Sequence, residues 1–304
     1  MNVAKLGRWL AKLRKETAGR ILVYGCAALV ILITLAIVVF VARQGLTTFV
    51  VDKISVFKFL FSSEWNPELP ASQGGPLLGS LTMSIGSLLT SGLAVLLAAP
   101  TAIIAAVFLV EIAPSWGRQV LQPAIELLAG IPSVVYGYTG LVVLVPLVRE
   151  RFGGMGFSLL AGGIVLGIMI LPTIASLSAD SLRALPSSLK EAAYALGSTR
   201  WQTIRLVLLP AAKPGILTGI ILGLARAFGE ALAVQMVIGN VRHIPHSILD
   251  PVITLTSAIT LDMGYTVSGS TWNNALWSMS LMLLVMTCIF ILLARMAAKG
   301  REVR

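Results

Sequence analysis

A cation and an anion lie four residues apart in an otherwise apolar part of the chain. Arg226 and Glu230 fall within GLARAFGEALAV, between the apolar segments PGILTGIIL and QMVIG. Residues at this spacing share a helix face and can pair, and an arginine at the middle of a membrane helix costs about 2.5–3.5 kcal/mol on insertion scales. Two interpretations are open. The two residues form a structural ion pair, or Arg226 binds a transported anion through its planar, two-pronged guanidinium while Glu230 holds it between cycles.

A second stretch combines polar residues with helix breakers. In ELLAGIPSVVYGY, Gly130 and Pro132 interrupt a helix that carries Glu126 before the break and Ser133 after it. Irregular backbone is tolerated at membrane depth only where protein or a cavity covers it, so freed N–H groups near Ser133 could face an anion. A kink that serves packing alone is an equal alternative. Glu126 and Ser133 are therefore further candidates for a substrate pathway.

Other reactive residue types form no pattern of a site. His243 and His246 have an H-x-x-H spacing in a loop without a further ligand cluster, and Cys26 and Cys288 lie inside apolar runs. This argues against a metal site and a disulfide framework. A membrane enzyme also lacks support, because no cluster of His, Cys or paired carboxylates stands on one side of the membrane.

The elements that must position these residues are membrane helices. The chain has 304 residues, of which 57% are hydrophobic and 12% charged. Its net charge of +10 is spread between apolar runs rather than gathered on a soluble face, which argues against nucleic-acid binding. A span needs about 20 apolar residues. The predicted fold is an all-α polytopic membrane protein with six spans at Ile21–Ala42, Leu77–Phe108, Leu121–Val148, Phe157–Ser178, Pro214–Val241 and Ala275–Ala294.

The basic residues predict the orientation. Sixteen of the 23 Lys and Arg residues fall on the side of the N-terminus, six fall on the opposite side, and Arg226 lies within a span. Both termini are therefore expected to be cytoplasmic. The predicted organisation is an amphipathic segment on membrane lipid (1–20), a retained anchor (21–42), an extracytoplasmic loop (43–76), a transmembrane domain (77–297) and a cytoplasmic tail (298–304).

The longest predicted cytoplasmic loop between spans covers residues 179–213. Two capping-box patterns, S-x-x-E from Ser188 and T-x-x-Q from Thr199, predict two short helices. Gly197 lies between them and suits a left-handed C-cap. An interfacial helical hairpin would account for this pattern without any partner.

The spacing within this loop also resembles a known motif. Glu191-Ala192-Ala193, Gly197 and the final leucine-proline pair match the E-A-A-x3-G-x9-I-x-L-P loop of ABC importer permeases, with Val207 in place of isoleucine. In that family the loop docks into a cleft of the ATPase subunit. The resemblance implies that Glu191, Ala192, Ala193 and Gly197 contact an ATPase.

Further stretches narrow the resemblance. ELLAGIPSVVYGY (Glu126–Tyr138) and LARAFGEALAVQMVIGN (Leu224–Asn240) resemble permeases of the bacterial phosphate-specific importer. WNP at Trp65–Pro67 and IMILPTI at Ile168–Ile174 look more like the PstC-type subunit than its PstA-type partner. The resemblance implies the type I ABC importer (MetI-like) fold, an inner-membrane location and phosphate as the substrate that Arg226 meets.

The resemblance also implies partners. These are a PstA-type permease, a PstB-type ATPase dimer and an extracytoplasmic PstS-type phosphate-binding protein. The chain has no G-x-x-x-x-G-K-[ST] loop, so ATP and Mg are expected to be used by the ATPase, and this chain is expected to bind no cofactor and to be no enzyme itself. The alternatives are a permease for sulfate or molybdate and an ATP-independent transporter or channel.

Overall fold

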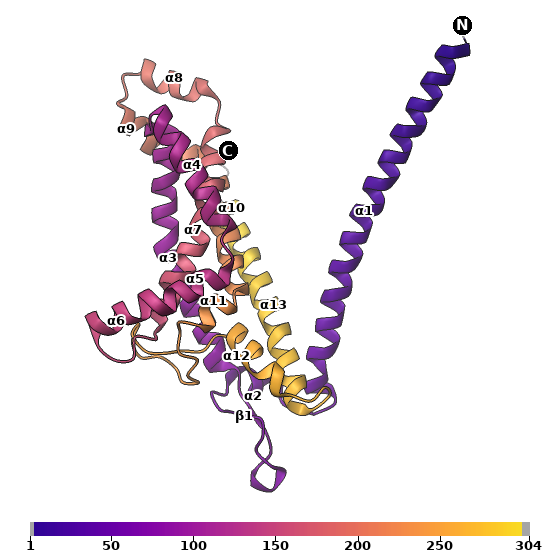
Figure 1. Ribbon diagram of the computed structural model, residues 1–304, viewed down its shortest axis with the longest axis vertical. Helices are drawn as coiled ribbons and strands as arrows, with labels where there is room; N and C mark the ends of the chain where they lie inside the picture. The colour runs from indigo at the N-terminus through magenta and orange to yellow at the C-terminus, as the bar shows by residue number, and fades with distance from the viewer. Residues whose placement is uncertain (1–2, 300–304) are drawn as a thin grey trace.

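The computed structural model describes the backbone of residues 3–299 and the side chains of residues 19–296 except those at positions 71 and 294. Helices form most of it (Figure 1). The helices are α1 (Val3–Val50), α2 (Val56–Phe61), α3 (Leu81–Val107), α4 (Ser115–Gly130), α5 (Ser133–Thr139), α6 (Val145–Phe152), α7 (Leu159–Arg183), α8 (Ser187–Ala195), α9 (Arg200–Gln202), α10 (Leu209–Gly229), α11 (Leu232–Gln235), α12 (Leu255–Asp262) and α13 (Thr271–Lys299).

Shorter elements link these helices. Strands β1 (Trp65–Asn66) and β2 (Leu77–Leu78) form an antiparallel hairpin with Trp65 opposite Leu78. Single 3-10 turns occupy Ala71–Gln73 and Met263–Tyr265. Wider π-helical turns occupy Phe108–Ile112, Gly140–Leu144 and Thr203–Leu208, and each continues an α-helix without a break.

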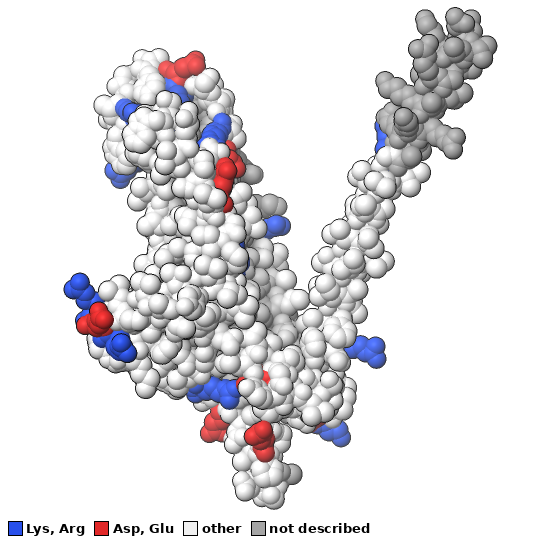
Figure 2. All heavy atoms as spheres, viewed as in Figure 1, with Lys and Arg blue, Asp and Glu red and all other residues white. Residues whose placement is uncertain are grey.

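The prediction of six membrane spans is confirmed. In the part of the chain that the structure describes, six helices are long and apolar enough to cross a membrane: Gly19–Val50, Leu81–Ile112, Ser133–Phe152, Leu159–Arg183, Arg200–Gly229 and Thr271–Leu293. The second is one continuous helix with Pro100 inside it, as expected from its length. A band almost free of charged side chains separates those near α8 from those near the hairpin (Figure 2).

The limits of the spans differ from the predicted ones, most of all in the third and the fifth. The third was expected to run over 121–148, but α4 ends at Gly130 and the span begins at Ser133. The fifth was expected over 214–241, but it begins at Arg200 and ends at Gly229. The second difference moves Glu230 out of the helix that carries Arg226.

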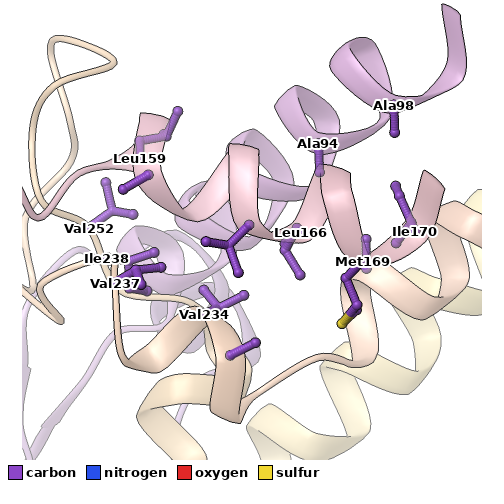
Figure 3. Packing of buried hydrophobic residues seen from close by; sticks show 14 of the residues in the cluster. Ala94, Ala98, Leu159, Leu166, Met169, Ile170, Val234, Val237, Ile238 and Val252 are labelled. Carbon is purple, nitrogen blue, oxygen red and sulfur yellow. The ribbon is translucent and has the colours of Figure 1, made fainter. Parts of the chain in front are cut away.

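Helices α3, α7 and α10 form the centre of the bundle. Ala94, Ala98 and Ala102 repeat every four residues along α3 and are buried against α7, whose Leu166 and Ile170 face them (Figure 3). A Cβ atom added at Gly163 would lie 2.6 Å from Cδ2 of Leu93. Small residues let membrane helices approach closely, so this seam gives the site a fixed frame.

Helix α1 is attached to the body at one end. The Ser278 hydroxyl on α13 donates to the Gly45 carbonyl at 2.6 Å, and the Asn274 side chain donates to Asp52 at 3.0 Å. The ring of Phe40 lies edge-on to Trp277 at 5.3 Å. Beyond this region α1 diverges from the other helices, and its side chains from 21 to 39 are exposed (Figure 1).

The hairpin defines one end of the molecule and α8 and α9 define the other (Figure 1). We call these the hairpin end and the loop end. Helices α1 and α13 both lie between the levels of the two ends, with the start of α1 and the finish of α13 directed toward the loop end. This places both ends of the described chain on the side of the 179–213 loop, the arrangement that the basic residues predict.

Candidate functional site

Two interrupted helices pack against each other within the bundle. One interruption separates α4 from α5 at Ile131 and Pro132, and the other separates α10 from α11 at Glu230. At their contact, a Cβ atom on Gly137 would lie 2.8 Å from the Cα atom of Ala233. Glycine at position 137 therefore lets α5 approach α11 directly. The two sequence stretches that carry the candidate residues meet here.

The first interruption follows from the sequence and the second was missed. Proline lacks the N–H that a helix interior needs, so the break at Pro132 is as predicted. The segment after Gly229 contains no proline and is apolar, which led to one uninterrupted span. The sequence feature that indicates this second interruption is Gly229, because glycine weakens a helix interior. In the structure the next residue, Glu230, adopts an extended conformation with φ −77° and ψ 127°.

Arg226 lies on the last turn of α10, and its side chain is exposed on an open face of the chain. Its Nη1 donates a hydrogen bond to Oγ1 of Thr173 on α7 at 3.3 Å. A guanidinium has five N–H donors, and within the described residues Thr173 is the single hydrogen-bond partner of this one. The remaining donors are open to a ligand.

Glu230 does not pair with Arg226, which corrects the expectation that the two share a helix face. The helix ends one residue before Glu230, so the i, i+4 geometry is lost. Its carboxylate instead accepts the N–H of Ala233 at 3.2 Å, and its carbonyl accepts the hydroxyl of Thr256 at 2.8 Å. Glu230 thus satisfies a backbone donor at the start of α11 and shapes the second interruption.

Ser133 and Glu126 lie on either side of the first interruption. Ser133 is the half-buried first residue of α5. The Tyr136 hydroxyl, one turn later, donates to the Leu128 carbonyl at 2.7 Å and so connects α5 to α4 across the break. Glu126 is exposed and accepts a hydrogen bond from Gln122 at 3.1 Å. It belongs to a polar group between α4 and α7 and does not contact Arg226.

The 179–213 loop contains the two short helices that the sequence predicts. Gly197 has φ +79°. The N–H of Gly197 bonds to the Tyr194 carbonyl at 2.9 Å, and the N–H of Ser198 bonds to the Ala193 carbonyl at 3.2 Å. These two bonds form a Schellman motif, which requires the left-handed residue. The capping box of Thr199 with Gln202 is also present.

The start of α8 differs from the prediction. The helix begins at Ser187 after Pro186, and no side chain caps it, so the capping box of Ser188 with Glu191 does not form. Pro186 supplies the extended backbone before the first turn, which makes Ser188 part of the helix. Glu191 is left exposed beside Ala192, whereas Ala193 is buried.

The outer surface of the loop carries large apolar side chains. Leu196 is 89% exposed and Trp201 is 61% exposed. Large apolar side chains at such exposure on a loop outside the apolar band suit contact with another protein. The exposed Glu191 and Ala192 stand on the helix that precedes Leu196.

Glu111 attaches this loop to the body, a role that sequence reasoning missed. Its carboxylate, 9% exposed, pairs with Nζ of Lys190 on α8 at 2.6 Å, and its backbone carbonyl accepts the guanidinium of Arg200 on α9. Both cations lie at the C-terminal end of a long helix, where positive charge is favourable. The sequence feature that could have indicated this role is the single acidic residue in FLVEIAP, at the end of the second span.

At the hairpin end, a different group of charges connects separate loops. Asp262 is buried and accepts two hydrogen bonds from Arg242 at 2.6 and 2.8 Å and one from the indole of Trp65 at 3.2 Å. Between Arg242 and Asp262 along the chain, the backbone N–H groups of His246 and Ser247 lower the pKa of the Asp250 carboxyl below its ordinary value. Among the described residues, no group of three or more His, Cys, Asp or Glu could hold a metal ion.

The sequence is similar to known transport permeases. Residues 98–302 match the family model described as "Binding-protein-dependent transport system inner membrane component". The chain is 54% identical over 289 residues to the probable ABC transporter permease protein YqgH of Bacillus subtilis, covering 95% of this chain and 92% of that one. It is 37% identical to the phosphate transport system permease protein PstC of Pasteurella multocida, covering 79% of each.

Solved structures share the fold. The chain superimposes on a subunit of a bacterial alginate ABC transporter with a TM-score of 0.62 at 18% identity, covering 90% of this chain and 92% of that one. It also matches a chain of the MetNI methionine ABC transporter in an inward-facing conformation, with a TM-score of 0.53 at 23% identity and coverage of 71% and 90%. At these identities the likeness concerns the fold alone, which is that of type I ABC importer permeases.

Proposed function

The chain belongs to the family of binding-protein-dependent transport system inner membrane components, and we propose that this ABC importer permease subunit moves inorganic phosphate inward, driven by a separate ATPase. The observation that carries the proposal is Arg226. Its guanidinium is held by Thr173 of α7, one turn before the interruption at Glu230, and keeps further donors open. A planar guanidinium can give two parallel hydrogen bonds to a phosphate group.

The substrate assignment has a second support in the relatives. The proteins named PstC from Pasteurella multocida and Haemophilus influenzae, 37% and 35% identical to this chain, are phosphate transport system permeases by name. Phosphate would pass Arg226 where α5 meets α11. The helix break at Pro132 also keeps backbone N–H groups free in the first turn of α5.

The proposed mechanism is alternating access with three kinds of partner subunit. An extracytoplasmic PstS-type protein delivers phosphate at the hairpin end, a PstA-type permease forms the other wall of the pathway, and a PstB-type ATPase dimer binds the 179–213 loop. Glu191, Ala192, Ala193 and Gly197 would form the contact with the ATPase. Both termini would be cytoplasmic in the inner membrane. ATP and Mg would be bound by the ATPase, and this chain would have no catalytic residues.

Transport by the complete complex tests this proposal. The complex is purified through a tag on this chain and placed in proteoliposomes with its binding protein. Uptake of radiolabelled phosphate, sulfate and molybdate is measured with ATP and with a non-hydrolysable analogue. We expect ATP-dependent uptake of phosphate. Uptake of sulfate or molybdate in preference to phosphate would reassign the substrate, and uptake without hydrolysis would contradict the coupling to an ATPase.

A further inference from the structure

We propose that the hydrogen bond between Arg183 and Gln122 is a positioning link that carries movement of the 179–213 loop to the interrupted helix beside Arg226. This inference rests on the proposed function, because it assigns the route by which an ATPase would act on the substrate pathway. The two residues are 61 positions apart in sequence and belong to different helices. Neither is part of the loop surface that would contact the ATPase or of the site around Arg226.

The link begins where the loop leaves the bundle. Arg183 is the last residue of α7, and α8 starts four residues later at Ser187. Its Nη2 donates to Oε1 of Gln122 on α4 at 2.9 Å, while its Nη1 lies 3.5 Å from Oδ1 of Asp180 on its own helix. The pairing with Asp180 directs the guanidinium, and the bond to Gln122 reaches the neighbouring helix.

The link continues along α4 to the break. The Gln122 amide donates through Nε2 to Oε1 of Glu126 at 3.1 Å, one turn closer to Gly130. Across the break, the Tyr136 hydroxyl donates to the Leu128 carbonyl at 2.7 Å, and the next residue, Gly137, packs against Ala233 of α11, which follows the helix that carries Arg226. Polar contacts and one stretch of α4 thus connect the end of α7 to the candidate phosphate site.

The packing at this place leaves room for α4 to move. A cavity of about 100 Å³ lies between the two helices and is lined by Gln122, Glu126, Ser176, Asp180 and Arg183 together with apolar side chains. The bond from Arg183 spans the helices beside this space. The close-packed helices α3 and α7 would move together as one rigid body. Helix α4 can shift relative to α7 because of the cavity, and the bond from Arg183 would then transmit part of the movement of α7 to it.

The exposure of the link argues against a main role in stability. The Arg183 side chain is 40% exposed and that of Asp180 is 67% exposed. Hydrogen bonds and ion pairs between exposed groups contribute little to the free energy of folding. Loss of the link should therefore leave the complex assembled, and its effect should appear in the coupling of hydrolysis to transport.

The experiment measures coupling in the complete complex in proteoliposomes with its binding protein. We compare Arg183→Leu, Gln122→Leu and the double variant, and record both phosphate uptake and ATP hydrolysis. Gln119→Leu is the matched control, because it makes the same change one turn earlier on the exposed surface of α4 and leaves the bond between Arg183 and Gln122 in place. We expect each single variant to lower phosphate moved per ATP at least fivefold, the double variant to be no worse than either, and the control to stay within twofold of the original.

Several results would overturn the link. Unchanged phosphate per ATP in both single variants would do so, as would additive losses in the double variant, because additive effects indicate independent sites. A lower yield of assembled complex with an unchanged ratio would assign the residues a structural role instead. Failure of the proposed function is distinguishable, because then the unaltered complex itself would take up no phosphate.

Discussion

Nη1 of Arg226 donates a hydrogen bond to Oγ1 of Thr173 at 3.3 Å, so the guanidinium on α10 is positioned by α7. Thr173 lies in IMILPTI, next to Pro172 inside α7. The expected partner, Glu230, instead bonds to the start of α11. The cation is therefore not neutralised by its sequence neighbour. Its charge is available to a ligand, and its direction is set by a neutral hydroxyl.

This arrangement predicts that Arg226 acts alone on the anion. Arg226→Gln should reduce phosphate uptake by about 10- to 100-fold, since a hydrogen bond to a charged group contributes roughly 1.5–3 kcal/mol. Arg226→Lys should also be impaired, because lysine keeps the charge and loses the two-pronged geometry. Uptake normalised to assembled complex measures both. Restoration of uptake by adding Glu230→Gln to Arg226→Gln would show instead that the two residues form a functional pair.

For Glu230 we predict a structural effect that depends on an acceptor oxygen and not on charge. Glu230→Gln keeps a carbonyl oxygen for the Ala233 N–H and should transport normally. Glu230→Ala leaves that donor without its partner and should destabilise the segment by about 1 kcal/mol, the usual cost of losing such a cap. Thermal unfolding of the complex and uptake are the two readouts. Equal loss of uptake in both variants would point to a need for the negative charge.

Gly197 should be the most sensitive position of the 179–213 loop. With φ +79°, Gly197→Ala should cost roughly 1–2 kcal/mol, Gly197→Asn should be milder because asparagine tolerates this conformation, and Gly197→Pro should disrupt the loop because proline fixes φ near −65°. Co-purification of the ATPase with this chain should fall in the order Asn, Ala, Pro. A normal level of ATPase in the proline variant would argue against docking at this bend.

The orientation can be tested with single cysteines. Cys26 and Cys288 are free and exposed, so both are first replaced by serine. The Ser72→Cys variant, with its cysteine in the hairpin, should then react with a membrane-impermeant reagent added outside the cell. The Ser198→Cys variant, with its cysteine in the 179–213 loop, should react only after the membrane is permeabilised. A reporter fused after Arg304 should be cytoplasmic. The reverse labelling pattern would place the 179–213 loop outside and remove its access to an ATPase.

The loop at the hairpin end should depend on pH through Asp250. Its folded pKa is depressed because it accepts the N–H groups of His246 and Ser247 at 2.8 and 2.9 Å. The stabilisation is thus fully present above the ordinary value of 3.8 and is lost as the pH falls through the lower folded value. Amide hydrogen exchange should show these two N–H groups protected at neutral pH and down to about pH 4. Asp250→Asn should reduce that protection at neutral pH, and equal protection in the two proteins would contradict the role of the carboxylate.

A structural feature could be predicted from the sequence when it is determined by residues close together in the chain. The six spans, the break at Pro132 and the bend at Gly197 were all predicted, because chain composition, proline and glycine act on their own neighbours. The end of α10 at Gly229 was missed, because it is stabilised by Thr256 bonding to the Glu230 carbonyl from 26 residues away. The attachment of the loop through Glu111 and the bond of Arg183 to Gln122 also join distant segments. Neither has a spacing that can be recognised along the chain.

The π-helical turn at Thr203–Leu208 has a consequence for how the loop and Arg226 are oriented. A π turn holds one more residue than the α-helical turn it replaces, and each residue of an α-helix advances the side-chain direction by about 100°. The turn stands between α9 and the helix that carries Arg226. Loss of one residue there would shift the angular phase of Arg226 against Thr199–Gln202 by about a quarter of a revolution. The number of residues in this turn therefore sets the direction of the Arg226 side chain relative to the 179–213 loop.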